Sequence, residues 1–378
     1  MSAATPVWVE IDAGAIAHNL DIVRSRLGET TRFCGVVKAD AYGHGISATL
    51  PVLMGAGVDI IGITSNDEAA EARRLGFTGR ILRVRVALRE EIEEAGELGI
   101  EEWLGGGDHA RVVTAAARTL RRPIRVHISL NSTGLTRDGM DAEDAQTPAL
   151  LGQIAASPEL AVVGICSHFP CEDADDVRAG TAAFRWQAAS AARMLGAGAD
   201  VELHSATSFA ALTVPESRMD LVRIGAALYG DTSAPVPELR SAMRLVSRIA
   251  AINPYPAGRT VGYDRMARLD RASRLAVVPV GYADGYPRTL GGRGHALVHG
   301  RKVPVVDRLA MNSLVIDVSD VPAVGIGDEV VLYGRQGSAE IRSADIERDS
   351  GSIAATAYAA WARLNPRVVV NLPTPAIR

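Results

Sequence analysis

The segment Gly35-Val36-Val37-Lys38-Ala39-Asp40-Ala41-Tyr42-Gly43-His44-Gly45 decides how the rest of the chain is interpreted. The apolar run at residues 33–37 predicts a buried strand, and small residues and glycines follow the lysine. Lys38 therefore stands at the carboxyl end of a strand, where α/β proteins place their chemistry. Burial there disfavours the ammonium form and leaves an amine that can attack a carbonyl carbon. The alternative to a reactive amine is a lysine at the end of a strand that only extends its charged group into solvent.

The composition indicates an ordinary globular protein. The 378 residues are 47% hydrophobic and 22% charged, which is enough chain for two domains. A formal net charge of -4 and an aromatic content of 4% favour neither a nucleic-acid partner nor a membrane surface. The cysteines have no metal-ligand spacing, so we expect no metal site. Because no signal peptide or bilayer-length apolar run is evident, we expect a cytoplasmic protein.

Strand-like and helical segments alternate through the first part of the chain. After the strand at 33–37, strand-like runs occur at 60–63, 81–84, 103–104, 124–130, 160–167, 201–204 and 221–224. Eight strands in this alternation predict an α/β fold, a (β/α)8 barrel, whose active site lies at the strand carboxyl ends. Periodicity alone also allows an open doubly wound sheet, although no G-x-G-x-x-G motif follows the first strand.

The pattern changes after about residue 230, where a proline-bearing connector occupies residues 231–237. Later strands lack long helices between them, at 243–251, 274–280, 296–299, 303–306, 313–318 and 329–333, before a helix at 353–364 and a strand at 367–372. We therefore predict a barrel domain over residues 1–235 and a mostly β C-terminal domain over residues 236–378. Residues 7–11 predict a further short strand near the start of the chain.

The segment around Lys38 resembles the lysine segment of the alanine racemase family, whose members bind pyridoxal 5'-phosphate (PLP). The resemblance extends along the whole chain, and its most specific second match is Gly281-Tyr282-Ala283-Asp284-Gly285-Tyr286-Pro287-Arg288. It implies an amino-acid racemase in which Lys38 bonds to the PLP cofactor. It also implies a homodimer whose active sites are shared across the interface.

Further cofactor contacts follow from the same resemblance. Arg223 matches the arginine that faces the pyridine nitrogen, and because arginine only donates, that nitrogen would stay unprotonated. Ser208 matches the serine that holds the phosphate, although a serine before a short helix could instead be only an N-cap. The cofactor-binding residues implied in this way are Lys38, Tyr42, His204, Ser208, Arg223, Gly225, Ala226 and Tyr358.

Racemisation needs a base on each face of the substrate's α-carbon. The resemblance assigns one face to Lys38 and the other to Tyr263, carried by the second domain of the partner subunit. Because a tyrosine hydroxyl is a weak acid, it needs activation, and His168 matches the histidine that contacts it. A lone histidine is more often a core residue. With Arg137 these residues form the implied catalytic set, and Arg137, Tyr282 and Met311 are the implied substrate-binding residues.

Two departures from the family pattern concern the substrate. Many alanine racemases carry a lysine shortly before the arginine that Arg137 matches, but residues 127–136 contain none. Asn131 or a bound anion is the expected replacement, and Asn312 stands in place of the usual aspartate after Met311. Both changes resemble the broad-specificity branch of the family. We predict interconversion of L- and D-alanine, with serine as an additional substrate, and keep a broad-specificity racemase not centred on alanine as an alternative.

Two other PLP proteins with a similar barrel are rival interpretations. A D-threonine aldolase-like lyase typically needs a divalent metal, and no ligand cluster is evident near the C-terminal end. A PLP-binding homeostasis protein would be non-enzymatic and would lack the second domain. The chain from Ser241 onward, with Tyr263 and Met311, argues against it.

Overall fold

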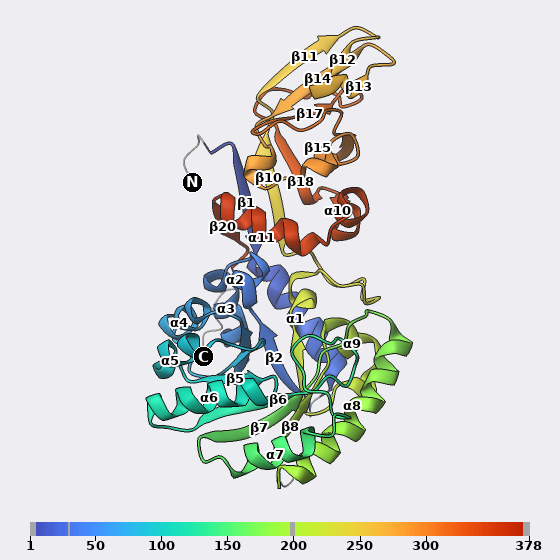
Figure 1. The fold of residues 1–378 in the computed structure, drawn as a ribbon. Helices are drawn as coiled ribbons and strands as arrows, with labels where there is room; N and C mark the ends of the chain where they lie inside the picture. Colours follow the sequence, from blue (N-terminus) through green and yellow to red (C-terminus); the bar gives the residue numbers. More distant parts are fainter. Residues whose placement is uncertain (1–4, 29–30, 197–200, 373–378) are drawn as a thin grey trace. The chain divides into compact units, whose positions relative to one another are not determined.

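The computed structural model describes residues 5–28, 31–196 and 201–372 (Figure 1). The chain forms two compact units. One comprises Ile16–Ala41 and Thr49–Leu239, and the other comprises Met1–Ala15, Tyr42–Ala48 and Arg240–Arg378. The chain therefore passes between the units on both sides of the short segment 42–48. The predicted division at residues 235 and 236 stays a prediction.

Eight parallel strands form the sheet of the first unit in the order β8-β7-β6-β5-β4-β3-β2-β9. Their bounds are β2 (Arg32–Val36), β3 (Ile60–Ile63), β4 (Arg80–Arg83), β5 (Ile100–Leu104), β6 (Ile124–Ser129), β7 (Leu160–Cys166), β8 (Glu202–His204) and β9 (Leu221–Ile224). Two backbone bonds next to β8 and β9 bring the end strands together, from Asp220 N to Leu203 O at 3.2 Å and from Arg223 N to Ala206 O at 3.0 Å. The predicted (β/α)8 barrel is confirmed as a nearly closed barrel, and each of its strands lies close to its predicted range.

Helices connect these strands. They are α1 (Ala13–Leu27), α2 (Lys38–Tyr42), α3 (Ile46–Gly55), α4 (Asn66–Arg74), α5 (Arg89–Glu94), α6 (Gly107–Leu120), α7 (Thr147–Ala156), α8 (Ala174–Met194) and α9 (Ser208–Thr213), with 3-10 turns η1 (Gly96–Leu98), η2 (Pro215–Ser217) and η3 (Ala226–Tyr229). The start of α8 shows why the long helix begins where it does. Asp173 is its N-cap, and its carboxylate accepts the N–H groups of Asp175 and Asp176.

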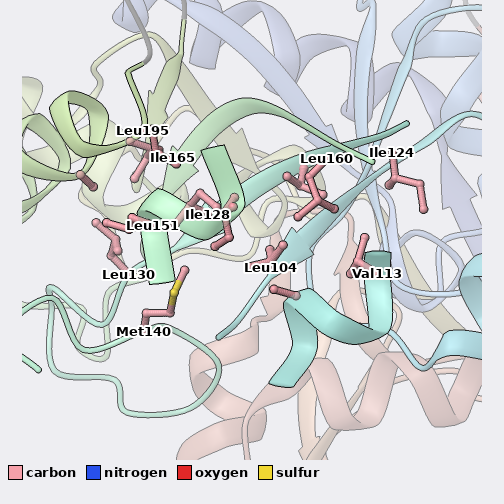
Figure 2. Close-up of a cluster of buried hydrophobic side chains, with 14 of the residues drawn as sticks. Leu104, Val113, Ile124, Ile128, Leu130, Met140, Leu151, Leu160, Ile165 and Leu195 are labelled. Atoms are coloured by element: carbon pink, nitrogen blue, oxygen red, sulfur yellow. The ribbon is translucent and has the colours of Figure 1, made fainter. Parts of the chain in front are cut away.

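A hydrophobic cluster packs helices α6, α7 and α8 against the outer side of strands β5, β6 and β7 (Figure 2). Leu104, Ile128 and Ile165 supply the strand side of this cluster and are fully buried. Each such side chain contributes roughly 1.5–3 kcal/mol by leaving water. Because side chains alternate along a strand, the neighbouring residues on each strand point into the barrel interior, where the candidate site begins.

The second unit is mainly β, as predicted. Its largest sheet has the order β16-β15-β18-β10-β1-β20, with β19 paired to β18. The bounds are β1 (Val7–Asp12), β10 (Met243–Arg248), β15 (His295–Val298), β16 (Arg301–Pro304), β18 (Glu329–Gln336), β19 (Ala339–Ile341) and β20 (Arg367–Val370). The strand predicted at residues 7–11 is confirmed, and it pairs with β10 and β20 in this sheet.

Smaller elements complete this unit. A three-stranded sheet joins β11 (Ala251–Tyr255), β14 (Ser273–Val278) and β17 (Leu314–Asp317), and β12 (Thr260–Val261) pairs with β13 (Ala267–Arg268). The helices are α10 (Ser343–Ser350) and α11 (Ala354–Leu364), with 3-10 turns η4 (Tyr263–Arg265), η5 (Tyr282–Asp284) and η6 (Arg288–Leu290). The single strand predicted at residues 243–251 is wrong, because the chain leaves β10 after Arg248 and starts β11 at Ala251. Within the described residues, no helix combines the length and the apolar character needed to cross a bilayer.

Candidate active site

Lys38 begins a turn with an unusual backbone, two residues after the end of β2. The four residues Ala39–Tyr42 all have φ between 52° and 56°, so this turn is left-handed. Residues with a side chain disfavour that conformation by roughly 1–2 kcal/mol each. Surrounding contacts must therefore hold the turn, and the cost is consistent with a functional role.

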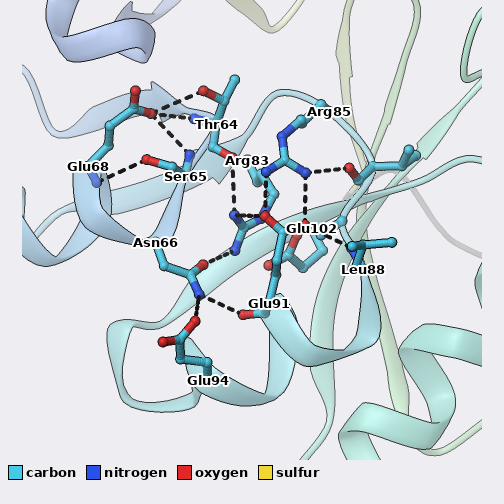
Figure 3. Close-up of polar contacts among 12 residues, drawn as sticks. Thr64, Ser65, Asn66, Glu68, Arg83, Arg85, Leu88, Glu91, Glu94 and Glu102 are labelled. Atoms are coloured by element: carbon cyan, nitrogen blue, oxygen red, sulfur yellow. Dashed lines mark hydrogen bonds and ion pairs between the residues drawn. The ribbon is translucent and has the colours of Figure 1, made fainter.

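Glu68, the third residue of α4, contacts both this turn and the loop before α4, and Figure 3 shows its bonds to that loop. Its Oε1 accepts the backbone N–H of Asp40 at 3.2 Å. Its Oε2 accepts the backbone N–H groups of Thr64 at 2.7 Å and Ser65 at 3.1 Å. Glu68 is not among the residues predicted from the sequence, although Ser65-Asn66-Asp67-Glu68 has the S-x-x-E pattern of a capping box.

Electrostatics at Lys38 favour a neutral amine. Burial lowers the pKa of its ammonium group, the guanidinium groups of Arg137 and Arg223 lower it further, and Glu68 opposes them. The chain contains one other lysine, Lys302. That residue is exposed on β16, where its Nζ lies 3.6 Å from the carboxylate of Asp345. Of the two lysines, Lys38 alone has the environment of a reactive amine.

Arg223, on β9, is buried inside the barrel. Its Nη1 donates to the backbone oxygen of His204 at 2.9 Å, and its Nη2 donates to that of Ser167 at 2.8 Å. The same nitrogens lie 2.6 Å from Nδ1 of His204 and 3.3 Å from Nδ1 of His168. Nε has no acceptor among the described residues and is available to a bound group.

His168 lies just beyond the end of β7, as predicted. Burial lowers the pKa of its imidazole to about 3, and the charges of Arg223, Arg137 and Lys38 act in the same direction. The ring is therefore neutral near pH 7. Because Arg223 can only donate to Nδ1, the ring proton is on Nε2, and His168 presents a hydrogen-bond donor there.

Ser208, Gly225 and Ala226 are brought together beside β9. The Oγ of Ser208 accepts the backbone N–H groups of Gly225 and Ala227, each at 3.2 Å. Ser208 is not the N-cap of α9, because Thr207 takes that position and its Oγ1 accepts the N–H of Ala210 at 3.4 Å. The hydroxyl of Ser208 therefore accepts two N–H groups and keeps its own proton to donate, which suits a phosphate oxygen.

Arg137 has an open environment. Its guanidinium is 52% exposed and lies 3.3 Å from the carboxylate of Asp138. The amide of Asn131 accepts the backbone N–H of Thr136 at 2.7 Å and donates to the Thr136 hydroxyl at 3.1 Å, and its predicted pairing with Arg137 stays a prediction. Because its side chain is half exposed, the guanidinium of Arg137 also has donors accessible to a second carboxylate, such as that of an amino acid.

The second unit carries the other predicted residues. Tyr282 and Met311 are brought together, because the N–H of Ala283 donates to the backbone oxygen of Met311 at 2.9 Å. A Cβ on Gly281 would lie 2.2 Å from that same oxygen, so only glycine allows this approach. Tyr263 follows β12, and its side chain is 61% exposed. Its neighbour Asp264 is ion-paired with Arg308.

Tyr358, on α11, is buried, and its hydroxyl lies 2.6 Å from that of Tyr333. The ring of His44 contacts it edge-on, with the ring centres 6.0 Å apart. Nδ1 of His44 lies 3.2 Å from the backbone oxygen of Tyr42. The predicted pair Tyr42 and Tyr358 is therefore linked within this unit through one histidine. Over residues 5–28, 31–196 and 201–372, no group of three or more His, Cys, Asp or Glu residues could hold a metal ion.

Two protein-family models match the chain. The alanine racemase N-terminal domain matches residues 11–233, and the alanine racemase C-terminal domain matches residues 242–369. Among known proteins, the broad specificity amino-acid racemase of Pseudomonas taetrolens is 44% identical over 363 residues, 96% of this chain and 89% of that protein. The lysine racemase of Proteus mirabilis is 41% identical over 365 residues, with the same coverage of 96% and 89%.

Solved structures agree along the whole chain. The alanine racemase from D-cycloserine-producing Streptomyces lavendulae has a TM-score of 0.87 at 33% identity and covers 98% of both chains. That of Bacillus anthracis with bound L-Ala-P has a TM-score of 0.87 at 26% identity, covering 99% of this chain and 97% of that chain. The similarity therefore includes the barrel, the β-rich unit and every predicted site segment.

Proposed function

Because the chain belongs to the alanine racemase family, whose cofactor is pyridoxal phosphate, we propose that this amino-acid racemase accepts several amino acids. Its range includes basic side chains and is not centred on alanine. The observation that carries this proposal is 41–44% identity, over 96% of the chain, to broad-specificity racemases and a lysine racemase. These relatives favour the broad-specificity alternative over the prediction of an alanine-centred enzyme.

The residues of the barrel unit fit the cofactor. Arg223 offers Nε–H to the pyridine nitrogen. The hydroxyl of Ser208, whose oxygen accepts the N–H of Gly225, and the N–H of Ala226 offer donors to the phosphate. Lys38 would hold the cofactor through its amine at the aldehyde carbon until the amine of the substrate displaces it, which would leave the lysine amine able to accept a proton. When bound, PLP makes the substrate's α-proton acidic by drawing electrons into its ring.

Lys38 and Tyr263 then move the α-proton on opposite faces of the substrate. The lowered pKa of Lys38 leaves a fraction of neutral amine, which can accept a proton near neutral pH. Tyr263 donates or accepts on the other face through its hydroxyl. His168 is neutral and carries its proton on Nε2, so it stabilises the tyrosine oxygen by donating a hydrogen bond. Arg137 pairs with the substrate carboxylate.

We further propose that the working molecule is a homodimer in which Tyr263 of one subunit serves the Lys38 of the other. The family resemblance supports this arrangement, and two-fold symmetry makes both sites of such a dimer equivalent. The exposed side chain of Tyr263 is consistent with a role outside its own unit.

A racemisation screen tests the substrate proposal. The purified protein is incubated with PLP and each L-amino acid, and the D-enantiomer is quantified by chiral chromatography. We expect lysine and arginine to be racemised together with alanine and serine. A kcat/KM for alanine that exceeds that for lysine and serine by more than about four decades is too large for a permissive pocket and would overturn the broad range.

A further inference from the structure

Three successive hydrogen bonds cross the barrel interior from Arg223 to a carboxylate. Nη1 of Arg223 lies 2.6 Å from Nδ1 of His204. Nε2 of His204 lies 2.9 Å from Nδ1 of His127, and Nε2 of His127 lies 2.9 Å from Oε2 of Glu101. All of these side chains are buried, the most accessible being Arg223 at 5% exposure. We call this series, Arg223-His204-His127-Glu101, the interior relay.

The two ends of the interior relay determine where every proton lies. A guanidinium only donates, so Nδ1 of His204 accepts from Arg223 and the ring proton of His204 is on Nε2. That proton is donated to Nδ1 of His127, which leaves the proton of His127 on Nε2, facing Glu101. The N–H of His127 and the guanidinium of Arg80 hold the pKa of Glu101 well below its usual range against the effect of burial, so its carboxylate accepts. Both imidazoles are therefore neutral and in the same tautomer.

The surroundings are shaped to hold this series. A Cβ on Gly164 would lie 2.2 Å from Nδ1 of His127, so the missing side chain makes room for the ring. The rings of His127 and His204 meet edge to face, with centres 4.9 Å apart. Arg80 donates to both carboxylate oxygens of Glu101, at 3.0 and 2.8 Å, and fixes its plane. Packing therefore holds the two histidine rings of the interior relay, and Arg80 holds the carboxylate of Glu101.

We propose that Glu101, His127 and His204 are positioning residues that fix the guanidinium of Arg223, so that its Nε–H is presented to the pyridine nitrogen of the cofactor. The inference rests on the proposed function, because it assumes a cofactor next to Arg223. If the interior relay is broken, the ring of His204 no longer holds Nη1 of Arg223 in a fixed place, and the guanidinium keeps only its backbone acceptors, among them the oxygens of His204 and Ser167. A merely structural network would stabilise the barrel without changing the environment of the cofactor.

The test compares three variants of the PLP-loaded enzyme. Glu101→Gln keeps the shape of the side chain but removes the charge at the end of the interior relay. His127→Phe removes both hydrogen bonds that His127 makes within the relay. Glu102→Gln is the matched control. This neighbouring carboxylate is equally buried and accepts from Nε of Arg83 at 2.9 Å, but it lies in the polar cluster of Figure 3, outside the interior relay.

For Glu101→Gln and His127→Phe we expect the dissociation constant of PLP to rise at least about tenfold, as loss of one well-made buried hydrogen bond implies. We also expect a shift in the visible absorption maximum of the bound cofactor, and kcat to fall with little change in KM. Glu102→Gln should lose thermal stability while keeping the wild-type absorption and PLP affinity. Wild-type absorption and PLP affinity in both relay variants would overturn the proposal.

A measurement on the wild-type enzyme keeps the proposal testable if a variant fails to fold. Neutron diffraction of the PLP-loaded protein should show one proton each on His204 and His127, both on Nε2. A proton on Nδ1 of His204, or two protons on His127, would contradict the interior relay. Failure of the proposed function would look different, because it would appear in the wild-type enzyme itself, as racemisation of alanine almost alone or as no binding of PLP, while the proton positions of the interior relay would not change.

Discussion

The backbone N–H of Asp40 donates to Oε1 of Glu68 across 3.2 Å, which ties the left-handed turn after Lys38 to the first turn of α4. Glu68→Gln should weaken this tie. The amide oxygen can serve Thr64 and Ser65, which leaves an NH₂ group facing the N–H of Asp40. We expect a loss of about 1–3 kcal/mol in the free energy of unfolding, measured by urea denaturation, and weaker retention of PLP.

Glu71→Gln is the control for that experiment. Glu71 lies on the same helix and pairs with Arg74 at the surface, at 2.6 Å. Exposed pairs contribute little, so this variant should unfold almost as the wild type does. Equal stability and equal PLP retention in the two variants would show that Glu68 does not hold the turn.

His168 makes stability depend on pH. Its pKa is about 3 in the folded protein and ordinarily 6.5, so below pH 6.5 the unfolded chain binds a proton that the folded protein does not. Stability therefore falls as the pH decreases from about 6.5 towards 3. Between pH 7 and pH 5 this group alone removes about 2 kcal/mol, and His168→Gln should show a loss smaller by that amount.

Urea denaturation at both pH values measures this difference, and His18→Gln, on α1, is the control. If His168→Gln and the wild type lose the same free energy of unfolding between pH 7 and pH 5, His168 is not a buried neutral residue.

The shared active site can be tested by mixing two inactive enzymes. Lys38→Ala lacks the amine and Tyr263→Phe lacks the hydroxyl, so neither homodimer should racemise. If sites combine Lys38 of one subunit with Tyr263 of the other, a hybrid dimer contains one intact site, and an equal mixture should recover about a quarter of wild-type activity. No recovery, in a mixture where mass spectrometry shows hybrid dimers, would place both residues of a site in one chain.

The sequence predicted the barrel well because buried parallel strands leave a plain signal. The run at residues 33–37 and the apolar segments at 60–63 and 221–224 all became strands near their predicted bounds. The pattern at residues 7–11 also predicted a strand, but no local signal assigns a strand to a sheet. Its pairing with β10 and β20 joins residues that lie more than two hundred positions apart.

The site was predictable only where a motif marks it. Lys38, Arg223 and Ser208 stand in recognisable segments, and the structure gives each a suitable environment. Glu101, His127 and Glu68 had no such marking, because their roles come from contacts across strands that the sequence does not show. Gly164 is the same kind of case, since its role is the space that it leaves for His127.

The central claim, that Lys38 is the amine that bonds to PLP, is tested most directly by reductive trapping. The PLP-loaded protein is treated with borohydride, digested and analysed by mass spectrometry. The chain contains only Lys38 and Lys302, so the outcome is easily assigned. We predict a phosphopyridoxyl group on the peptide with Lys38 and an unmodified Lys302. A label on Lys302 alone, or a Lys38 peptide without the group, would contradict the claim.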